Sequence, residues 1–338
     1  MVICRLIIFF KFMIDKDFIP KIDLSSLVIN GATSPQSFDT IKEIKKACED
    51  VGFFTVINHG IPNTSVEKIH SNCKKFFSLP LKKKLTFSPN KWNKKSDTLY
   101  RGYFPRTVNG KEGLDIGDPL LTTSMKELTQ KEKFEVNHDM SLIDGEWQLN
   151  VNDYYDKVFS LGIILFRALI CCISDNIELA DIAFQRPKTF STLRFNYYPK
   201  QDKPVEISSQ DGVALGCETH VDSGIMTILY QDKKGGLQVQ NRNNLQWYDV
   251  PHDPGSLVIN SGLALQFLTN DYFKATNHRV LINKEERISI PFFFEPSYDF
   301  DLNPKYLGIT DKPIHEINNY EIFLTQSLRK FTEYDRNI

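Results

Sequence analysis

The feature that most constrains the fold is a series of short, strand-like segments in the second half of the chain. From residue 189 onward, runs of β-branched and aromatic residues alternate with turn residues. The turns include Gly235-Gly236, Asn243-Asn244 and Asp253-Pro254-Gly255. About eight strands at this spacing predict a β-sandwich or jelly roll. The predicted strands cover residues 192–198, 226–231, 237–240, 246–250, 256–260, 264–269, 278–282 and 287–294.

The first half and the C-terminal end show the periodicity of amphipathic helices instead. Residues 37–50 and 64–79 each carry an apolar stripe, and the strand-like run 53–58 lies between them. The middle of segment 150–177 is apolar almost all round, which indicates a buried helix behind a sheet. A last helix is predicted over 319–331. We therefore expect a mainly β fold with flanking helices.

Composition limits the classes of function. The chain has 338 residues, 41% hydrophobic and 25% charged, which is typical of soluble globular proteins with one large core or two domains. A net charge of −1 gives no electrostatic reason to expect nucleic acid or an anionic membrane as partner. The six cysteines form no C-x-x-C pair, so we expect a reduced, cytoplasmic protein. We expect it to act as a monomer on a small molecule.

The N-terminal end is a separate feature. Residues 1–13 are apolar, but Arg5 and Lys11 interrupt them, and the run is too short to span a bilayer. They also lack the small-residue cleavage site of a signal peptide. We expect residues 1–12 to form an unstructured or weakly docked extension, with Met13 as the functional start.

A possible metal site begins at His220-x-Asp222, just before the strand-like run 225–230. If both residues lie on extended chain, the two-residue period places their side chains on one face. His278 offers a third ligand. Two histidines and one carboxylate with open positions suit non-haem Fe(II) and leave room for O2. The same ligands suit catalytic zinc, although the chain has no H-E-x-x-H motif.

Two more polar pairs have the same spacing, Asn196/Tyr198 and Arg287/Ser289. Each interrupts a strand that is otherwise apolar or aromatic, so each pair should point to a single side of its strand. A buried arginine is costly unless an anion matches it. We therefore predict that a ligand carboxylate binds to Arg287 and Ser289.

Together these motifs resemble the signature of the Fe(II)/2-oxoglutarate-dependent dioxygenases, in their isopenicillin N synthase-like branch. The resemblance extends over roughly residues 18–333 and is specific through the combination of motifs, not through any single one. The matching motifs are His220-x-Asp222, His278, Arg287-x-Ser289, Ile19-Pro20-x-Ile22-Asp23-Leu24, Gly52-Phe53-Phe54-x-Val56-x-Asn58-His59-Gly60-Ile61 and Phe76-Phe77-x-Leu79-Pro80.

The resemblance implies roles for particular residues. His220, Asp222 and His278 would hold Fe(II), and Arg287 and Ser289 would bind the distal carboxylate of 2-oxoglutarate. In the family's Asn-Tyr-Tyr-Pro strand, the Asn and the second Tyr help to hold this co-substrate; the matching residues are Asn196 and Tyr198.

The substrate side is less defined. Arg101 and Tyr103 resemble positions that often line the substrate mouth in this family. Phe292 and Phe294 follow the Arg-x-Ser motif, and by alternation one of them should face the cavity; packing in the core is the alternative.

The implied fold is a double-stranded β-helix (jelly roll) core with a helical N-terminal region and a C-terminal helix. We predict an N-terminal region at 14–125, a connecting segment with the long buried helix at 126–188, the oxygenase core at 189–300 and a C-terminal helical segment at 301–338.

The implied activity is oxidation of a small organic substrate by hydroxylation, desaturation or ring closure. It would consume 2-oxoglutarate and O2 and release succinate and CO2. Two alternatives stay open from the sequence: an oxidase like isopenicillin N synthase, which keeps the Arg-x-Ser pair without using 2-oxoglutarate, and a non-catalytic metal-binding protein on the same scaffold.

Overall fold

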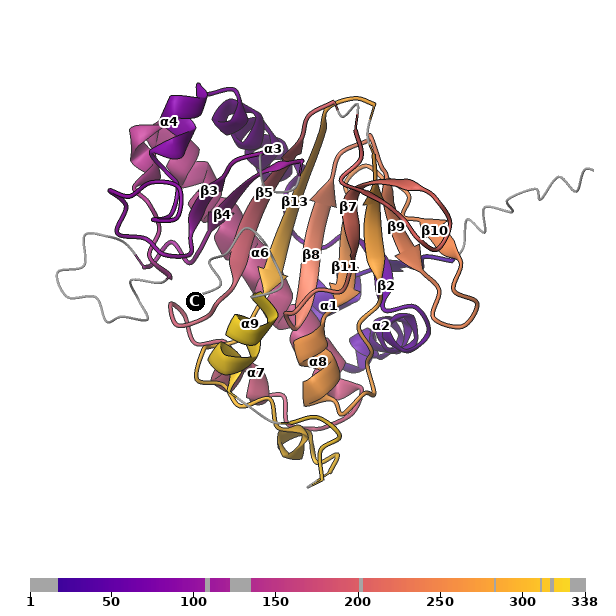
Figure 1. Ribbon diagram of the computed structural model, residues 1–338. Coiled ribbons are helices and arrows are strands. Elements are labelled where there is room, and N and C mark those ends of the chain that lie inside the picture. Colours follow the sequence, from indigo (N-terminus) through magenta and orange to yellow (C-terminus); the bar gives the residue numbers. More distant parts are fainter. Residues whose placement is uncertain are drawn as a thin grey trace, which may run out of the picture.

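The protein is built around two β-sheets, with helices along the larger sheet (Figure 1). The computed structural model describes residues 18–106, 110–121, 135–200, 203–282, 284–310, 312–316 and 319–328. The extension predicted at residues 1–12 and the start at Met13 lie outside these ranges. None of the described helices is long and apolar enough to cross a membrane.

The larger sheet has eight strands in the order β1-β2-β11-β8-β13-β5-β4-β3. Its neighbours are antiparallel except for the parallel pair of β1 and β2. The strands are β1 (Lys21–Asp23), β2 (Phe53–Ile57), β3 (Gly102–Phe104), β4 (Glu112–Ile116), β5 (Thr192–Tyr198), β8 (Met226–Gln231), β11 (Leu257–Ser261) and β13 (Arg287–Phe294).

The smaller sheet has five antiparallel strands in the order β10-β9-β12-β7-β6. From β5 onward the chain passes repeatedly between the sheets, so that β5, β8, β11 and β13 lie in the larger one and the intervening strands lie in the smaller one. The smaller sheet consists of β6 (Glu206–Ile207), β7 (Ala214–His220), β9 (Leu237–Gln240), β10 (Trp247–Asp249) and β12 (His278–Leu281).

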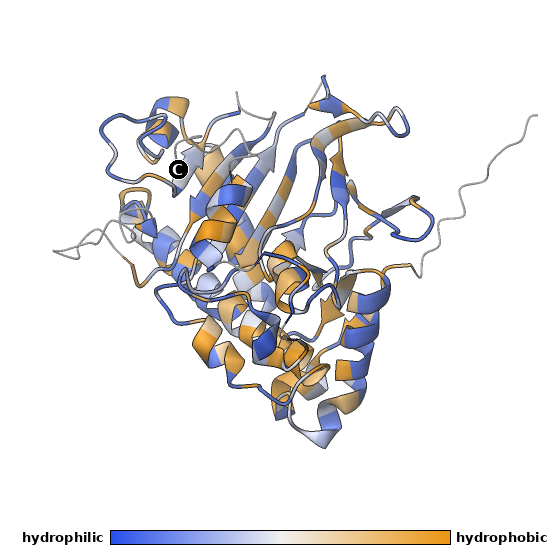
Figure 2. Ribbon diagram, turned by 60° about the horizontal axis from the view of Figure 1, so that its bottom comes forward, coloured by the Kyte–Doolittle hydropathy of each residue, from blue (hydrophilic) through white to orange (hydrophobic). Residues whose placement is uncertain are grey.

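The three long helices α2 (Phe38–Asp50), α3 (Asn63–Phe77) and α6 (Gly145–Cys171) pack on the face of the larger sheet that points away from the smaller one. They turn apolar residues toward the sheet and polar residues outward, as the colouring of Figure 2 shows for α2. The helices are α1 (Ser25–Asn30), α2 (Phe38–Asp50), α3 (Asn63–Phe77), α4 (Leu81–Leu85), α6 (Gly145–Cys171), α7 (Leu179–Ala183), α8 (Leu263–Leu268) and α9 (Tyr320–Leu328).

The long helix α6 lies directly against β13. Gly162 makes this close approach possible, because an added Cβ would lie 2.5 Å from Cδ2 of Phe294. The helix begins at Gly145, five residues before the predicted start. Asp144 caps it there, since its carboxylate accepts a hydrogen bond from the backbone N–H of Glu146.

Two predictions about the strands were wrong. The run 264–269 is helical, in α8, because alanine, leucine and glutamine favour helix and a six-residue run is too short to distinguish the two periods. The strand β7, which leads into the His-x-Asp motif, was not predicted. This strand alternates poorly and includes Gly216, so it lacks a clear strand pattern.

Candidate active site

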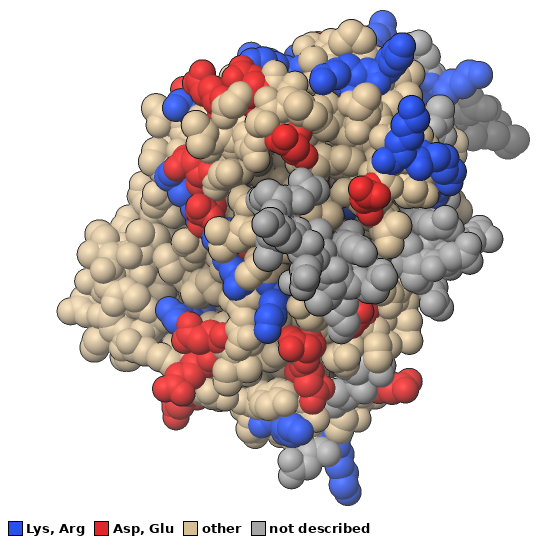
Figure 3. Space-filling view, turned by 90° about the vertical axis from the view of Figure 1, so that its left-hand side faces the viewer, with Lys and Arg blue, Asp and Glu red and all other residues tan. Residues whose placement is uncertain are grey.

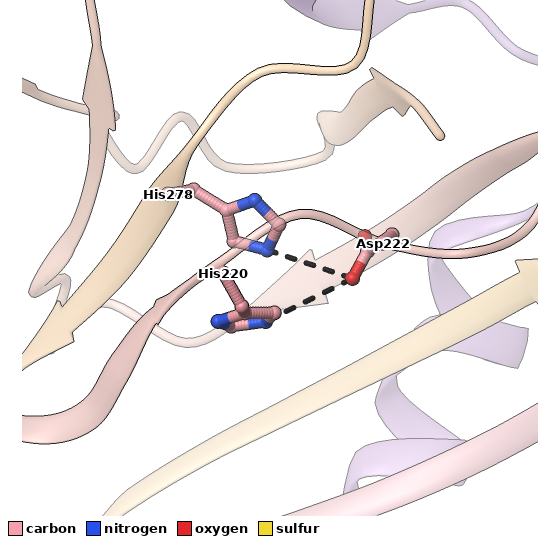
Figure 4. A group of neighbouring side chains, drawn as sticks. All are labelled: His220, Asp222 and His278. Atoms are coloured by element: carbon pink, nitrogen blue, oxygen red, sulfur yellow. Dashed lines mark ion pairs between the residues drawn. The ribbon is translucent and has the colours of Figure 1, made fainter. Parts of the chain in front are cut away.

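Three potential metal ligands converge where β7 ends and β12 begins. His220 is the last residue of β7 and pairs across the strands with His278, the first residue of β12. Asp222 follows two residues after His220. Its Oδ1 lies 3.8 Å from Nε2 of His220 and 3.6 Å from Nε2 of His278. Figure 4 shows the three side chains pointing toward one another, and their ligand atoms all lie within 4.8 Å of each other.

Hydrogen bonds orient the carboxylate of Asp222. Its Oδ2 accepts from Thr227 Oγ1 at 2.5 Å and from Asn260 Nδ2 at 2.8 Å. The other oxygen, Oδ1, is the one that faces the two histidines. Such outer contacts are typical of metal ligands because they fix the ligand atom in place.

Both imidazoles are oriented in the same way. Nδ1 of His220 lies 2.8 Å from the carbonyl oxygen of Glu218, and Nδ1 of His278 lies 3.3 Å from that of Thr276. A carbonyl oxygen can only accept, so each Nδ1 carries the proton and donates it. The Nε2 atoms are then unprotonated and free to bind a cation.

The electrostatics favour a bound cation. Burial lowers the pKa of His220 to about 4, and the neighbouring His278 adds to this effect. For Asp222, burial acts to raise the pKa, but the two imidazoles and the hydrogen bonds from Thr227 and Asn260 outweigh it, so the pKa is below its ordinary value. At neutral pH His220 is therefore neutral and Asp222 is ionised, so both can bind a metal ion without first losing a proton.

The predicted carboxylate site is formed by facing residues of β5 and β13. Arg287 pairs with Tyr198 and Ser289 pairs with Asn196. Arg287 is 1% exposed, and its Nε donates to the carbonyl oxygen of Gly235 at 2.7 Å. Its Nη1 has no hydrogen-bond partner among the described residues. A buried, unsatisfied guanidinium nitrogen fits an incoming carboxylate.

Other polar groups lie beside Arg287. The guanidinium carbon of Arg287 lies 5.0 Å from the ring centre of Tyr198. Asn196 Nδ2 lies 3.5 Å from Ser289 Oγ, and Asn196 Oδ1 has no partner in the described part of the chain. The structure thus brings together the four residues that the sequence analysis assigned to the co-substrate.

A cavity opens beside the potential metal ligands. Several of its polar residues were not predicted from the sequence, although Thr192 and Arg194 lie on the same face of β5 as Asn196 and Tyr198. Strand alternation could have revealed them. The cavity is lined by Tyr100, Lys111, Thr192, Arg194, Cys217, Glu218, His220, Val221, Asp222, Ser223, Phe293, Glu295 and Leu328.

The prediction that Phe292 or Phe294 faces the cavity was wrong. Both are fully buried on the opposite side of β13, where Phe292 packs against Tyr155 and Phe294 packs against Phe159 of α6. Phe293 lines the cavity instead. The reason is strand alternation, because odd-numbered residues share the side of Arg287.

Arg101 and Tyr103 also lie away from the cavity. Arg101 is completely buried in an ion pair with Glu135, and Tyr103 donates a hydrogen bond to Glu112 at 2.5 Å. Their neighbour Tyr100 is the residue of this segment that lines the cavity. The prediction for Arg101 and Tyr103 was therefore wrong.

The outer surface next to this region has no uniform charge. The face at the left of Figure 1, seen directly in Figure 3, carries basic and acidic side chains interspersed.

Comparison with known proteins agrees with this geometry. Residues 189–296 match the model of the 2OG-Fe(II) oxygenase superfamily, and residues 19–154 match that of the non-haem dioxygenase in morphine synthesis N-terminal family. The 1-aminocyclopropane-1-carboxylate oxidase of Dictyostelium mucoroides is 30% identical over 95% of this chain and 97% of its own. Isopenicillin N synthase of Streptomyces griseus is 27% identical over 85% and 87%.

A solved structure shows the same likeness. A full-length Neurospora crassa protein, crystallised in complex with alpha-KG, is 25% identical, with a TM-score of 0.75 over 92% of this chain and 95% of its own. The chain belongs to the 2OG-Fe(II) oxygenase superfamily. It is an oxidoreductase that uses Fe(II), 2-oxoglutarate and O2 to oxidise a small organic substrate, with release of succinate and CO2.

Proposed function

We propose that one interior site carries out this reaction, with the metal and the co-substrate held side by side. The observation that carries the proposal is the unpartnered Nη1 of Arg287, buried between the sheets on the inner face of the larger one. The metal ligands are His220, Asp222 and His278; the distal carboxylate of 2-oxoglutarate binds Arg287 and Ser289, with help from Asn196 and Tyr198.

In this proposal the protein supplies orientation. Bound Fe(II) provides the oxidising chemistry that couples decarboxylation of 2-oxoglutarate to oxidation of the substrate. Thr227 and Asn260 keep Oδ1 of Asp222 directed at the metal position. Arg287 fixes the far end of the co-substrate, so that its keto-acid end points toward the histidines.

We also propose that the core is a double-stranded β-helix. The support is the order of the strands, because β5, β8, β11 and β13 are contributed to one sheet and β7, β9, β10 and β12 to the other in alternation along the chain. A cytoplasmic location fits the described cysteines, which are all free thiols (Cys48, Cys73, Cys171, Cys172 and Cys217).

The test is turnover of 2-oxoglutarate by protein purified without oxygen and loaded with Fe(II). Succinate should form on addition of O2, and a metabolite library should reveal compounds that accelerate it. His220→Ala and Asp222→Ala should abolish both metal retention and succinate formation while the proteins stay folded. Succinate formation that persists in both variants would refute the metal assignment. Substrate turnover that needs no 2-oxoglutarate would indicate the oxidase alternative.

A further inference from the structure

A buried carboxyl group, that of Glu295, lines the cavity beside the potential metal ligands. Glu295 directly follows β13 and, by alternation, shares the side of Arg287, Ser289 and Phe293. It lines the same cavity as Asp222 and is 4% exposed. From Ser289 to Glu295 the extended chain spans about 20 Å. Glu295 is thus well separated from the carboxylate site and available to the substrate.

The backbone holds Glu295 in place. Its N–H donates to Ser191 Oγ at 3.1 Å, and its carbonyl oxygen accepts from the same hydroxyl at 2.9 Å. The side chain is less satisfied, because neither Oε2 nor the nearby hydroxyl of Tyr320 has a partner within 3.5 Å in the described part of the chain, although the two groups interact electrostatically. A buried, rigidly mounted polar group without a partner is expected to be completed by a ligand.

Among the described residues, Glu295 forms no ion pair of its own. The two nearby guanidinium groups are already paired, Arg101 with Glu135 and Arg194 with Asp115. Neither arginine is therefore free to neutralise a second buried carboxylate.

The protonation of Glu295 follows from these surroundings. Burial raises the pKa of Glu295 to about 8, and the carboxylates of Glu135 and Asp115 add to this effect. Arg101 and the hydroxyl of Tyr320, on α9, act in the opposite direction without cancelling it. The carboxyl group is therefore mostly protonated at neutral pH and can donate a hydrogen bond.

We propose that Glu295 is the substrate-recognition residue of this cavity and donates a hydrogen bond to a neutral acceptor, a carbonyl oxygen, on the substrate. The inference rests on the proposed function, because it assumes that the substrate occupies the cavity beside the metal. Phe293 and Leu328, which line the same cavity, supply apolar contact for the rest of the molecule.

A cationic substrate group fits this end of the cavity less well. The rings of Tyr100 and Phe293 line it, and each already faces a guanidinium, with Arg101 at 4.6 Å from the first ring centre and Arg194 at 5.4 Å from the second. Each ring therefore already has a cation–π partner, and neither is left open for such a contact with a substrate ammonium. The predicted substrate class is therefore small, neutral and carbonyl-bearing.

Three ring-matched probes test this proposal: cyclohexanone, cyclohexylamine and cyclohexanecarboxylate. The protein is loaded with Mn(II) and 2-oxoglutarate, and paramagnetic broadening of each probe's proton signals is measured by titration. Cyclohexanone should bind most tightly. Glu295→Leu should weaken its binding roughly five-fold, the loss of one hydrogen bond, whereas Glu295→Gln should retain it because the amide still donates. The same two substitutions at Glu206, exposed on β6, serve as controls.

The pH dependence gives a second readout that does not depend on the folding of Glu295→Leu. Affinity for cyclohexanone should fall above about pH 8 in the natural protein and stay constant in Glu295→Gln. Preference for cyclohexylamine, unchanged binding in Glu295→Leu, or no binding of cyclohexanone would each overturn the proposal. Failure of the proposed function itself has a different signature, namely that the signals of 2-oxoglutarate are not broadened by Mn(II).

Discussion

At the scale of single residues, the metal site depends on how Asp222 is held. The carboxylate receives hydrogen bonds from Thr227 of β8 and Asn260 of β11, so two strands of the larger sheet orient a ligand that follows the smaller one. Without them the side chain could rotate Oδ1 away from the histidines. The outer contacts are therefore as much a part of the site as the ligands.

Asn260→Ala should lower metal affinity by about 10- to 100-fold, because Oδ2 loses one of its two hydrogen bonds and the carboxylate becomes mobile. Isothermal titration with Mn(II) measures this effect. Thr86→Ala, on the surface near α4, is a control that should leave the affinity unchanged. Natural affinity in Asn260→Ala would show that the amide does not orient the ligand.

The metal ligands could be predicted from the sequence, but the residues that hold Asp222 in position by hydrogen bonds could not. His220, Asp222 and His278 were found because the residue types and the spacing are specific to metal chemistry. Asn260 and Thr227 belong to no motif of their own, and Asn260 lies 38 residues from the carboxylate it binds. Only the pairing of β8 with β11 brings the two beside Asp222.

Glu295 also gives a prediction about stability. Because burial raises its pKa from 4.5 to about 8, the folded state retains the proton over a range in which the unfolded state has lost it. The contribution of Glu295 to the free energy of unfolding should therefore decrease as pH rises from 4.5 to 8, whereas the lowered pKa of His220 acts in the opposite direction between about pH 4 and 6.5. In urea unfolding of metal-free protein, the difference in stability between the natural protein and Glu295→Gln should therefore decrease between pH 4.5 and 8.

A residual slope is expected in that variant from Glu135, whose pKa burial raises to about 7. Identical pH profiles for the natural protein and Glu295→Gln would mean that Glu295 is ionised in the folded state. Substitution of an exposed carboxylate such as Glu206 should leave the profile unaffected.

At the scale of elements, β13 separates two environments. Its odd-numbered residues, from Arg287 to Phe293, face the interior between the sheets, and its even-numbered residues face α6. The prediction for Phe292 and Phe294 was wrong because the alternation of faces was not counted from Arg287 along the whole strand. Applying one period of two along all eight residues assigns both faces correctly.

The contact between α6 and β13 can be tested with two glycines of the same helix. Gly162→Ala should destabilise the protein by roughly 1–3 kcal/mol, since the new methyl group meets the ring of Phe294 and forces a shift. Gly145→Ala should be neutral or slightly stabilising, because no atom lies within 4 Å of its added Cβ. Chemical denaturation compares the two, and equal stability would contradict the close approach.

Elements differed in how well the sequence predicted them. The helices α2 and α3 were predicted to within two residues, because their apolar stripes repeat over several turns. Short elements were not, since α8 was mistaken for a strand and β7 was omitted. In segments of six or seven residues, tertiary contacts decide between helix and strand.

At the scale of the whole molecule, the proposed reaction joins the two sheets. Two metal ligands belong to the smaller sheet, His220 and His278, whereas Arg287 and Ser289 belong to the larger one. The alternating strand order that creates this interior cannot be read from strand lengths and turns, because those do not specify which strands pair. A bound metal and co-substrate would therefore connect the two sheets. The individual strands of these sheets could be predicted from the sequence, but their pairing could not.

This bridging predicts an ordered pattern of thermal stabilisation. Mn(II) alone should raise the Tm, and 2-oxoglutarate should raise it further only when the metal is present, because its two ends need both sheets. At a ligand concentration 100 times Kd the gain is about 2.7 kcal/mol, equivalent to several degrees. Calorimetry with metal, with co-substrate and with both measures each contribution.

Arg287→Gln separates the two contributions. It should retain the Mn(II)-dependent rise in Tm, because the metal ligands are intact, and lose most of the additional rise caused by 2-oxoglutarate. Each shift is taken relative to the variant's own ligand-free Tm, which removes any effect of the substitution on folding. Ser289→Ala should give a smaller loss, since it removes one hydroxyl and no charge. An undiminished response to 2-oxoglutarate in Arg287→Gln would place the carboxylate of the co-substrate somewhere other than between β5 and β13.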